Sequence, residues 1–211
     1  MDAINFVFWL RLAAAGLAAY FLGSLNASII ISNRFLRTDI RRHGSGNAGM
    51  TNSFRVMGFN YGIVVTVCDL FKGVAAVFIG WAIAGSLEGR FIAAMFVLIG
   101  HCFPVFYGFK GGKGVLSAAG AFLVLDWRIG LSAISLFLFI LLITKMVSVS
   151  SITAAASLFV WALVYDYGEP AYLAVAILTA LLLIFMHRSN IKRIIEGTES
   201  KVSFKKEKNP K

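Results

Sequence analysis

The sequence predicts an all-α integral membrane protein with about seven transmembrane helices, the N-terminus outside and the C-terminus in the cytoplasm. Three observations support this fold class. Hydrophobic residues make up 59% of the chain and charged residues only 14%, which is outside the range of soluble domains. Apolar runs long enough for helices alternate with short polar segments. Basic residues are concentrated in alternate connections, as the positive-inside rule requires of a multi-pass protein.

The first apolar run, Phe6 to Ile31, follows Asp2 rather than a basic segment and is too long for the core of a signal peptide. We therefore expect it to remain as a span. The fourth run is shorter than the roughly 20 residues of a normal span, so it is a tilted helix, a short helix or a re-entrant segment. The runs after the first are Phe59 to Ala84, Phe91 to Phe106, Val115 to Leu125, Ile129 to Ile143, Ile152 to Tyr165 and Ala171 to Met186.

The charge distribution predicts the orientation of these spans. With an odd number of crossings and the N-terminus outside, one side of the membrane receives only Arg90 and Arg128, while the other receives most basic residues. The basic side is expected to be cytoplasmic. Residues 1–200 are predicted to form a single polytopic membrane domain, and residues 201–211 a disordered basic tail attracted to anionic headgroups.

Composition also argues against several functions. The net charge of +10 does not indicate nucleic-acid binding, because the basic groups are not interleaved with exposed aromatics on a soluble domain. Three histidines without a carboxylate cluster do not predict a metal site, and no cofactor is expected. Cys68 and Cys102 lie inside apolar runs, where we expect them to pack rather than to form a disulfide. For His101, near Pro104, packing is also favoured over a ligand role.

The first polar cluster runs from Asp39 to Arg55 and includes the segment His43-Gly-Ser-Gly-Asn-Ala-Gly-Met-Thr-Asn52. Glycines allow backbone amides to approach an anion, and Ser, Thr and Asn add short donors that can surround a phosphate. The cluster therefore predicts a phosphate-binding loop. The alternative is an ordinary cytoplasmic loop with solvated arginines.

The second cluster, Gly108-Phe-Lys-Gly-Gly-Lys-Gly114, joins the third and fourth runs. Amides at a helix N-terminus together with two lysines favour phosphate binding. The spacing differs from that of a P-loop, so nucleotide hydrolysis is not implied. A tight turn with lysines reaching the interface is the alternative.

A third cluster pairs Asp69 with Lys72 on one face of the second run. Each charge alone would cost roughly 2.5 to 3.5 kcal/mol at that depth. The sequence leaves open whether they form a buried packing pair or belong to a site.

The fourth cluster follows the last run and reads His187-Arg-Ser-Asn-Ile-Lys-Arg193, followed by Gly197-Thr-Glu199. His187 and Asn190 share a face if the helix continues past the membrane edge. Ser151, near the start of the sixth run, could add a hydroxyl, although serine often lines helix interfaces in membranes. The predicted topology brings the loops and this cluster to the cytoplasmic face.

These motifs resemble those of one family, the bacterial acyl-phosphate:glycerol-3-phosphate acyltransferases, also called the PlsY family. Gly44-Ser-Gly-Asn-x-Gly-x-Thr-Asn52 with Arg55 resembles its first motif, and Gly100-His-x-Phe-Pro-Val-Phe with Phe109-Lys-Gly-Gly-Lys-Gly-Val115 its second. His187-Arg-x-Asn-Ile-x-Arg193 with Gly197-Thr-Glu199 is similar to its third. Met50, Leu116-Ser117 and Leu25-Asn-Ala27 depart from the usual pattern, which affects the expected loop shape and first-helix kink more than the chemistry.

The resemblance implies transfer of a fatty acyl group from acyl phosphate to the 1-hydroxyl of glycerol 3-phosphate, at the cytoplasmic face of a bacterial inner membrane. Ser45 is expected to donate or accept a hydrogen bond rather than act as a nucleophile. His187 and Asn190 are expected to orient the hydroxyl, with His187 or a donor phosphate oxygen accepting its proton. The expected substrate-binding residues are Asn47, Thr51, Asn52, Arg55, Lys110, Gly111, Gly112, Lys113, Gly114, Ser151, Arg188 and Arg193.

A transporter or channel for a small phosphorylated solute is the alternative function. Transporters usually place their site near the midplane of the membrane, whereas these polar clusters gather at one face. A metal-dependent phosphatidyltransferase would need a cluster of aspartates that the chain lacks.

Overall fold

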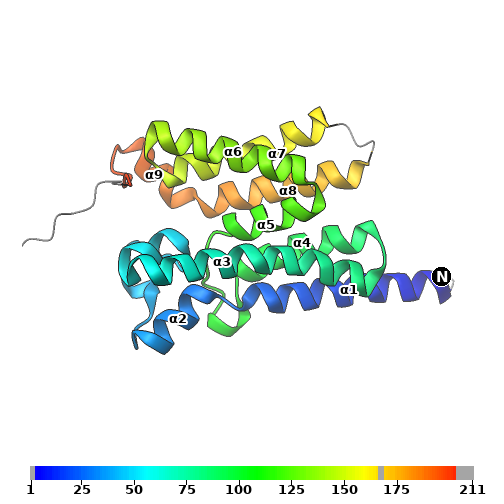
Figure 1. Cartoon of the computed structure of the whole chain (residues 1–211). Helices are drawn as coiled ribbons and strands as arrows, with labels where there is room; N and C mark the ends of the chain where they lie inside the picture. Colours follow the sequence, from blue (N-terminus) through cyan, green and yellow to red (C-terminus); the bar gives the residue numbers. More distant parts are fainter. Residues whose placement is uncertain (1–2, 166–168, 203–211) are drawn as a thin grey trace, which may run out of the picture.

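The computed structural model describes residues 3–165 and 169–202, and its regular structure is helical (Figure 1). This confirms the predicted all-α class. Most of the predicted tail, 201–211, lies outside the described residues. The elements are α1 (Ala3–Ser24), α2 (Ala27–Phe35), η1 (Ile40–Arg42), α3 (Met50–Ala84), α4 (Leu87–Cys102), η2 (Val105–Tyr107), α5 (Val115–Leu125), α6 (Trp127–Thr144), α7 (Val147–Val164), α8 (Pro170–Met186) and α9 (Arg188–Ile195).

In the described ranges, five helical stretches are long and apolar enough to cross a membrane, or six if α8 and α9, which meet at a 58° bend, are counted as one span. The short fourth run is α5, with 11 residues. A helix of that length covers about 16 Å, roughly half the hydrocarbon thickness. The chain is therefore a multi-pass membrane protein, while seven crossings and the orientation of the termini remain predictions.

Two breaks interrupt the helices, one inside the first predicted run and one just before the second. The first run, expected to be one span, is divided at Asn26, which has an extended backbone and accepts a hydrogen bond from the Ile29 amide at 3.1 Å. Asn26 thereby caps α2 and separates it from α1. In α3 the break is at Gly58, whose φ of +80° favours glycine. The predicted second run begins directly after it, at Phe59.

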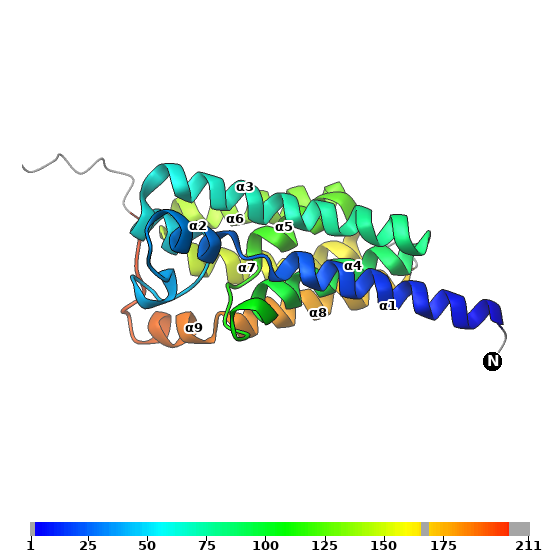
Figure 2. The same cartoon turned by 90° about the horizontal axis from the view of Figure 1, so that it is seen from below.

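The helices form two layers with α5 between them. Helices α1, α3 and α4 pack together on one side, α6, α7 and α8 pack together on the other, and α5 contacts both α3 and α6 (Figure 1). Helices α2 and α9 and the beginning of α3 lie at the end of the bundle away from the N-terminus (Figures 1 and 2). The polar loops are thus close to one end of the molecule.

Glycines allow the helices to approach closely. A Cβ at Gly100 in α4 would lie 2.2 Å from the carbonyl oxygen of Tyr20 in α1. A Cβ at Gly73 in α3 would lie 2.1 Å from the carbonyl oxygen of Ser117, and one at Gly120 would lie 2.1 Å from that of Leu70. Small residues at such crossings are typical of membrane helix packing. They fix the short α5 firmly against α3, and with it the turn that precedes α5.

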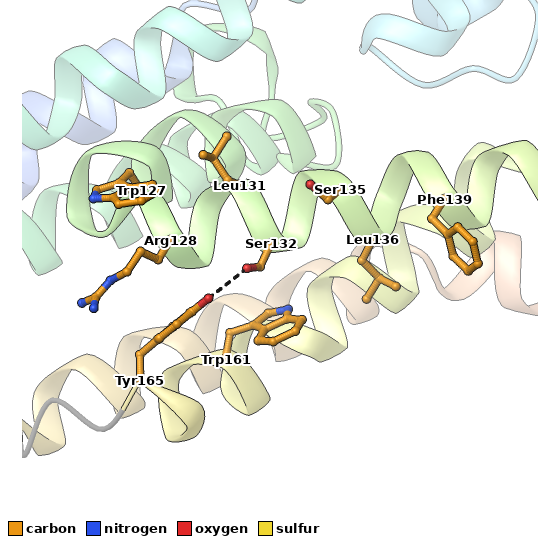
Figure 3. Close-up of a pocket in the computed structure, with 9 residues that line it drawn as sticks. All are labelled: Trp127, Arg128, Leu131, Ser132, Ser135, Leu136, Phe139, Trp161 and Tyr165. Carbon is orange, nitrogen blue, oxygen red and sulfur yellow. Dashed lines mark hydrogen bonds between the residues drawn. The ribbon is translucent and has the colours of Figure 1, made fainter.

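A hollow of about 640 Å³ opens between α6 and α7 (Figure 3). Its lining is mainly aromatic and aliphatic, and the hydroxyls of Ser132 and Tyr165 lie 3.3 Å apart within it. None of the predicted site residues lines this hollow. The candidate site therefore has to be sought at the polar loops.

Candidate active site

Asn52 organises the first polar loop. Its amide nitrogen donates to the carbonyl oxygens of His43 and Ile40 at 3.0 and 3.3 Å, and its oxygen accepts from the amide of Ser45 at 2.9 Å. The side chain is only 2% exposed. Asn52, predicted to bind substrate, uses its polar atoms here to shape the loop.

The far end of the same loop is attached to the break between α1 and α2. Asn26 donates from its side chain to the carbonyl oxygen of Ala48 at 3.1 Å. The hydroxyls of Ser28 and Ser53 lie 2.7 Å apart, joining α2 to the beginning of α3. Buried polar groups bonded in this way define a single loop conformation.

Arg41 connects the first loop to the second. Its guanidinium donates to the carbonyl oxygens of Tyr107 and Lys110 at 2.7 and 3.1 Å and forms an ion pair with Asp39 at 2.8 Å. Hydrogen bonding to Arg41 lowers the pKa of Asp39 below its ordinary value. Arg41 lies inside the first polar cluster, but no sequence pattern indicated that it would join two loops.

The glycine turn from Gly111 to Gly114 packs tightly on the end of α4. The amides of Gly111 and Gly112 donate to the carbonyl oxygens of Cys102 and His101, both at 3.1 Å. A Cβ at Gly112 would lie 2.2 Å from Nε2 of His101 and 2.6 Å from the carbonyl oxygen of Ala48. Gly114 has a φ of +83° and is the N-cap of α5. Positions 111 and 112 therefore require glycine, and the turn brings the two loops into contact.

Lys113 extends from this turn to the fourth cluster. Its ammonium group donates to the side-chain oxygen of Asn190. Asn190 donates to Glu199 at 2.7 Å, and the other carboxylate oxygen of Glu199 accepts from Arg193 at 2.7 Å. Burial lowers the pKa of Lys113 to about 8, with Glu199 opposing this effect and Arg193 adding to it. The predicted residues Lys113, Asn190 and Arg193 thus form one polar chain.

His187 lies at the bend between α8 and α9 and is 2% exposed. Its Nδ1 is 2.8 Å from the carbonyl oxygen of Leu183. Because a carbonyl oxygen only accepts, Nδ1 carries the proton, and Nε2 of the neutral ring is an acceptor. His187 can therefore accept a hydrogen bond from a substrate hydroxyl.

Other predicted binding residues stand apart from the polar chain. Ser151 is buried and donates to the carbonyl oxygen of Val147 in its own helix at 2.8 Å. Arg188 is exposed and donates to the carbonyl oxygen of Phe185 at 3.2 Å, with its guanidinium over the Phe185 ring. Ser45, Arg55 and Lys110 are exposed, while Asn47 and Thr51 are half-buried.

Asp69 and Lys72 form the buried ion pair that was one of the two interpretations, with a separation of 2.8 Å. Lys72 also lies 2.7 Å from Nδ1 of His101. His101 is 3% exposed, as expected for a packed residue. Sequence reasoning did not connect this cluster to the glycine turn, and it missed Glu199 as a partner of Asn190.

Comparison with known proteins identifies the family. The family model for glycerol-3-phosphate acyltransferase matches residues 13–197. The chain belongs to the glycerol-3-phosphate acyltransferase family. It is 37% identical to glycerol-3-phosphate acyltransferase 2 of Bacillus anthracis, over 87% of this chain and 95% of that protein. It is 38% identical to the glycerol-3-phosphate acyltransferase of Finegoldia magna, over 92% of this chain and 98% of that one.

Two crystal structures of PlsY, an integral membrane glycerol 3-phosphate acyltransferase, have the same fold at 34% identity. The glycerol 3-phosphate form has a TM-score of 0.85 and the lysophosphatidic acid form 0.82, and each covers 91% of this chain. The matched regions cover 96% and 95% of the two PlsY chains, respectively. This acyltransferase is therefore a membrane-embedded enzyme whose polar clusters surround the glycine turn.

Proposed function

We propose that this acyltransferase transfers a fatty acyl group from acyl phosphate to the 1-hydroxyl of glycerol 3-phosphate, forming 1-acylglycerol 3-phosphate. The observation that carries the proposal is the contact of Lys113, within the glycine turn, with Asn190, which is linked through Glu199 to Arg193. Both substrates carry about two negative charges near neutral pH, so their approach requires cations and aligned amides.

In the proposed reaction, the oxygen of the 1-hydroxyl attacks the carbonyl carbon of the acyl phosphate. The new ester bond forms, the bond between the acyl carbon and the phosphate oxygen breaks, and inorganic phosphate leaves with the bonding electron pair. The hydroxyl proton passes to Nε2 of His187 or to an oxygen of the leaving phosphate. Because acyl phosphate is already activated, positioning and charge stabilisation are sufficient and no protein nucleophile is needed.

The residues have separate proposed roles. Lys113 binds a substrate phosphate beside the glycine turn, with Arg193 and the exposed Arg55 adding positive charge. Gly111, Gly112 and Gly114 shape the turn, because the amides of Gly111 and Gly112 already donate to carbonyl oxygens at the end of α4. Asn190 and His187 orient the hydroxyl, and Ser45 contributes a hydrogen bond at the mouth of the first loop. Asn47, Thr51, Lys110, Ser151 and Arg188 are retained as candidate binding residues.

We further propose that the site opens to the cytoplasm, with the acyl chain of the donor among the helices. The positive-inside distribution supports this orientation. Glycerol 3-phosphate would then enter from water, while the lipid-soluble donor would arrive through the bilayer of a bacterial inner membrane.

The direct test gives purified protein in proteoliposomes palmitoyl phosphate and labelled glycerol 3-phosphate. Acyl-CoA and acyl carrier protein are the comparison donors. We expect labelled lysophosphatidic acid with palmitoyl phosphate alone. Product formed only from a thioester donor would overturn the donor assignment, and no product from any donor would overturn the function.

The transporter alternative is tested in the same vesicles without an acyl donor. Time-dependent uptake of labelled glycerol 3-phosphate into the lumen would support transport, whereas we expect none. For the residue assignments, Ser45→Ala and Asn190→Ala should each lower turnover, while Ser157→Ala, whose hydroxyl donates to the Ala154 carbonyl oxygen in its own helix, should not. Full turnover in the first two variants would remove those assignments.

A further inference from the structure

The buried cluster of Asp69, Lys72 and His101 is not used by the proposed reaction, yet it lies directly behind the glycine turn. Asp69 is 2% exposed, Lys72 7% and His101 3%. Such charges are expensive inside a membrane protein and usually have a function. The cluster joins the middle of α3 to the end of α4, the next helix along the chain.

Lys72 is the centre of this cluster. Its ammonium lies 2.8 Å from a carboxylate oxygen of Asp69 and 2.7 Å from Nδ1 of His101. It also lies 3.4 and 3.5 Å from the carbonyl oxygens of Gly23 and Leu25, where α1 ends. Since a charged ammonium only donates, Nδ1 of His101 accepts, and the ring proton is on Nε2. Lys72 thereby fixes both the rotation and the tautomer of the imidazole.

The imidazole in turn limits the position of the glycine turn. Nε2 of His101 would lie only 2.2 Å from a Cβ at Gly112, so the ring edge lies against that glycine. The backbone carbonyl of the same histidine accepts the Gly112 amide at 3.1 Å. His101 therefore contacts the turn through both its side chain and its backbone.

The other end of the turn depends on the same part of α3. Ser117, in the first turn of α5, donates to the backbone carbonyl of Asp69 at 3.0 Å. The close approach of Gly73 to the Ser117 carbonyl, described above, excludes any shift of α5 toward α3. The part of α3 that contains Asp69 and Lys72 thus supports the glycine turn in two ways, directly through α5 and indirectly through His101.

We infer that Asp69, Lys72 and His101 are positioning residues that hold the Gly111–Lys113 turn in the conformation that binds a substrate phosphate. The inference rests on the proposed function, because it assigns a phosphate to that turn. None of the three is required to touch the substrate. Their effect passes through the edge of the imidazole to Gly112 and from there to the neighbouring Lys113.

The test compares KM and kcat for palmitoyl phosphate and glycerol 3-phosphate in His101→Asn and Lys72→Gln. Asparagine keeps an acceptor near the Nδ1 position but lacks the ring edge that contacts Gly112. We expect the KM for the substrate whose phosphate the turn binds to rise about tenfold, as for the loss of a buried hydrogen bond. The KM for the other substrate should change by less than about twofold. Thr179→Val, at a buried hydroxyl in α8, is the matched control.

A double-mutant cycle separates positioning from general destabilisation. Gly112→Ala should be less harmful in the His101→Asn background, because part of the space for the new Cβ is then free. In the Thr179→Val background, Gly112→Ala should raise KM by the same factor as it does in the wild type. The inference would be overturned if Gly112→Ala raised KM by the same factor in both backgrounds, or if kcat fell while both KM values stayed unchanged.

Thermal unfolding with added glycerol 3-phosphate or inorganic phosphate gives a readout independent of turnover. A rise in Tm of the wild type that is lost in His101→Asn supports the inference even if no acyl transfer occurs, in which case only the proposed function fails. Equal Tm shifts in wild type and His101→Asn would contradict it. Recovery of the normal KM in Lys72→Arg, which keeps the cation, is also expected.

Discussion

The two polar regions of the site use their side chains in opposite ways. In the loop from His43 to Asn52, the buried amides of Asn26 and Asn52 bond to the backbone and fix its shape. In the region from His187 to Glu199, side chains bond to one another, and Lys113 and Asn190 carry charge and hydrogen-bonding groups to a common point. In the first region, side chains bond to the backbone and shape it, whereas in the second they bond to one another.

This contrast predicts different consequences of mutation. A side chain that touches the ligand can be removed without moving the backbone, so its loss should change activity more than stability. A side chain that shapes a loop should change both, because its removal leaves buried backbone groups unpaired. The predictions below test this division, beginning with the largest expected effect.

Replacing Lys113 should have the largest effect on activity. Lys113→Met removes the buried cation beside Asn190 while keeping a long apolar stem, and we expect kcat/KM to fall about 100-fold, as for a charged hydrogen bond worth roughly 3 kcal/mol. Lys110→Met, at the exposed lysine of the same turn, should cost less than about threefold. Steady-state assays of both variants check this. A larger loss of kcat/KM in Lys110→Met than in Lys113→Met would make Lys110 the phosphate-binding lysine instead.

Replacing Asn52 should weaken both stability and activity. Asn52→Ala removes one acceptor and two donors that bond to the loop backbone, and we expect the free energy of unfolding to fall by about 1–3 kcal/mol. We also expect kcat/KM to fall about tenfold, because the loop loses its single conformation. Chemical denaturation in detergent and the standard assay measure these changes. Asn60→Ala, at an exposed position of α3, is the control. Normal stability combined with lost activity would instead place Asn52 in contact with substrate.

The pH dependence of kcat/KM should report the charge of Lys113. Burial lowers the pKa of this lysine to about 8, so its positive charge is present below that pH and is lost as the pH rises through it. We expect kcat/KM to fall about fivefold between pH 8 and pH 9. Lys113→Arg, whose guanidinium stays charged, should remove this fall. A profile that is the same in both proteins would show that another group titrates.

The sequence predicted the fold class, the multi-pass character and the segments that form the site, because apolar runs and glycine-rich motifs are local signals. It predicted that the clusters holding Lys113, Asn190 and Arg193 lie at one face, and the structure joins these three residues, but the sequence could not show that Glu199 bonds to two of them. Contacts such as that of Arg41 with the Lys110 carbonyl depend on how distant loops meet, which no local pattern records. The roles of Asn52 and Ser151 were difficult to predict for the same reason, since a buried amide or hydroxyl can bond to the backbone as well as to a ligand.

Two arginines of the last motif provide the smallest and most discriminating comparison. Arg188 is exposed and covers the end of α8 through Phe185, whereas Arg193 donates to Glu199 at 2.7 Å. We expect Arg188→Ala to change kcat/KM by less than about twofold, because exposed charges contribute little. Arg193→Ala should lower it about fivefold by releasing Glu199, which then competes with the substrate phosphate for Lys113. Parallel assays at low and high ionic strength check this. If the Arg188 variant alone lost activity, the ligand would extend over the outer face of α9, and the polar chain at Lys113 would form only one wall of its site.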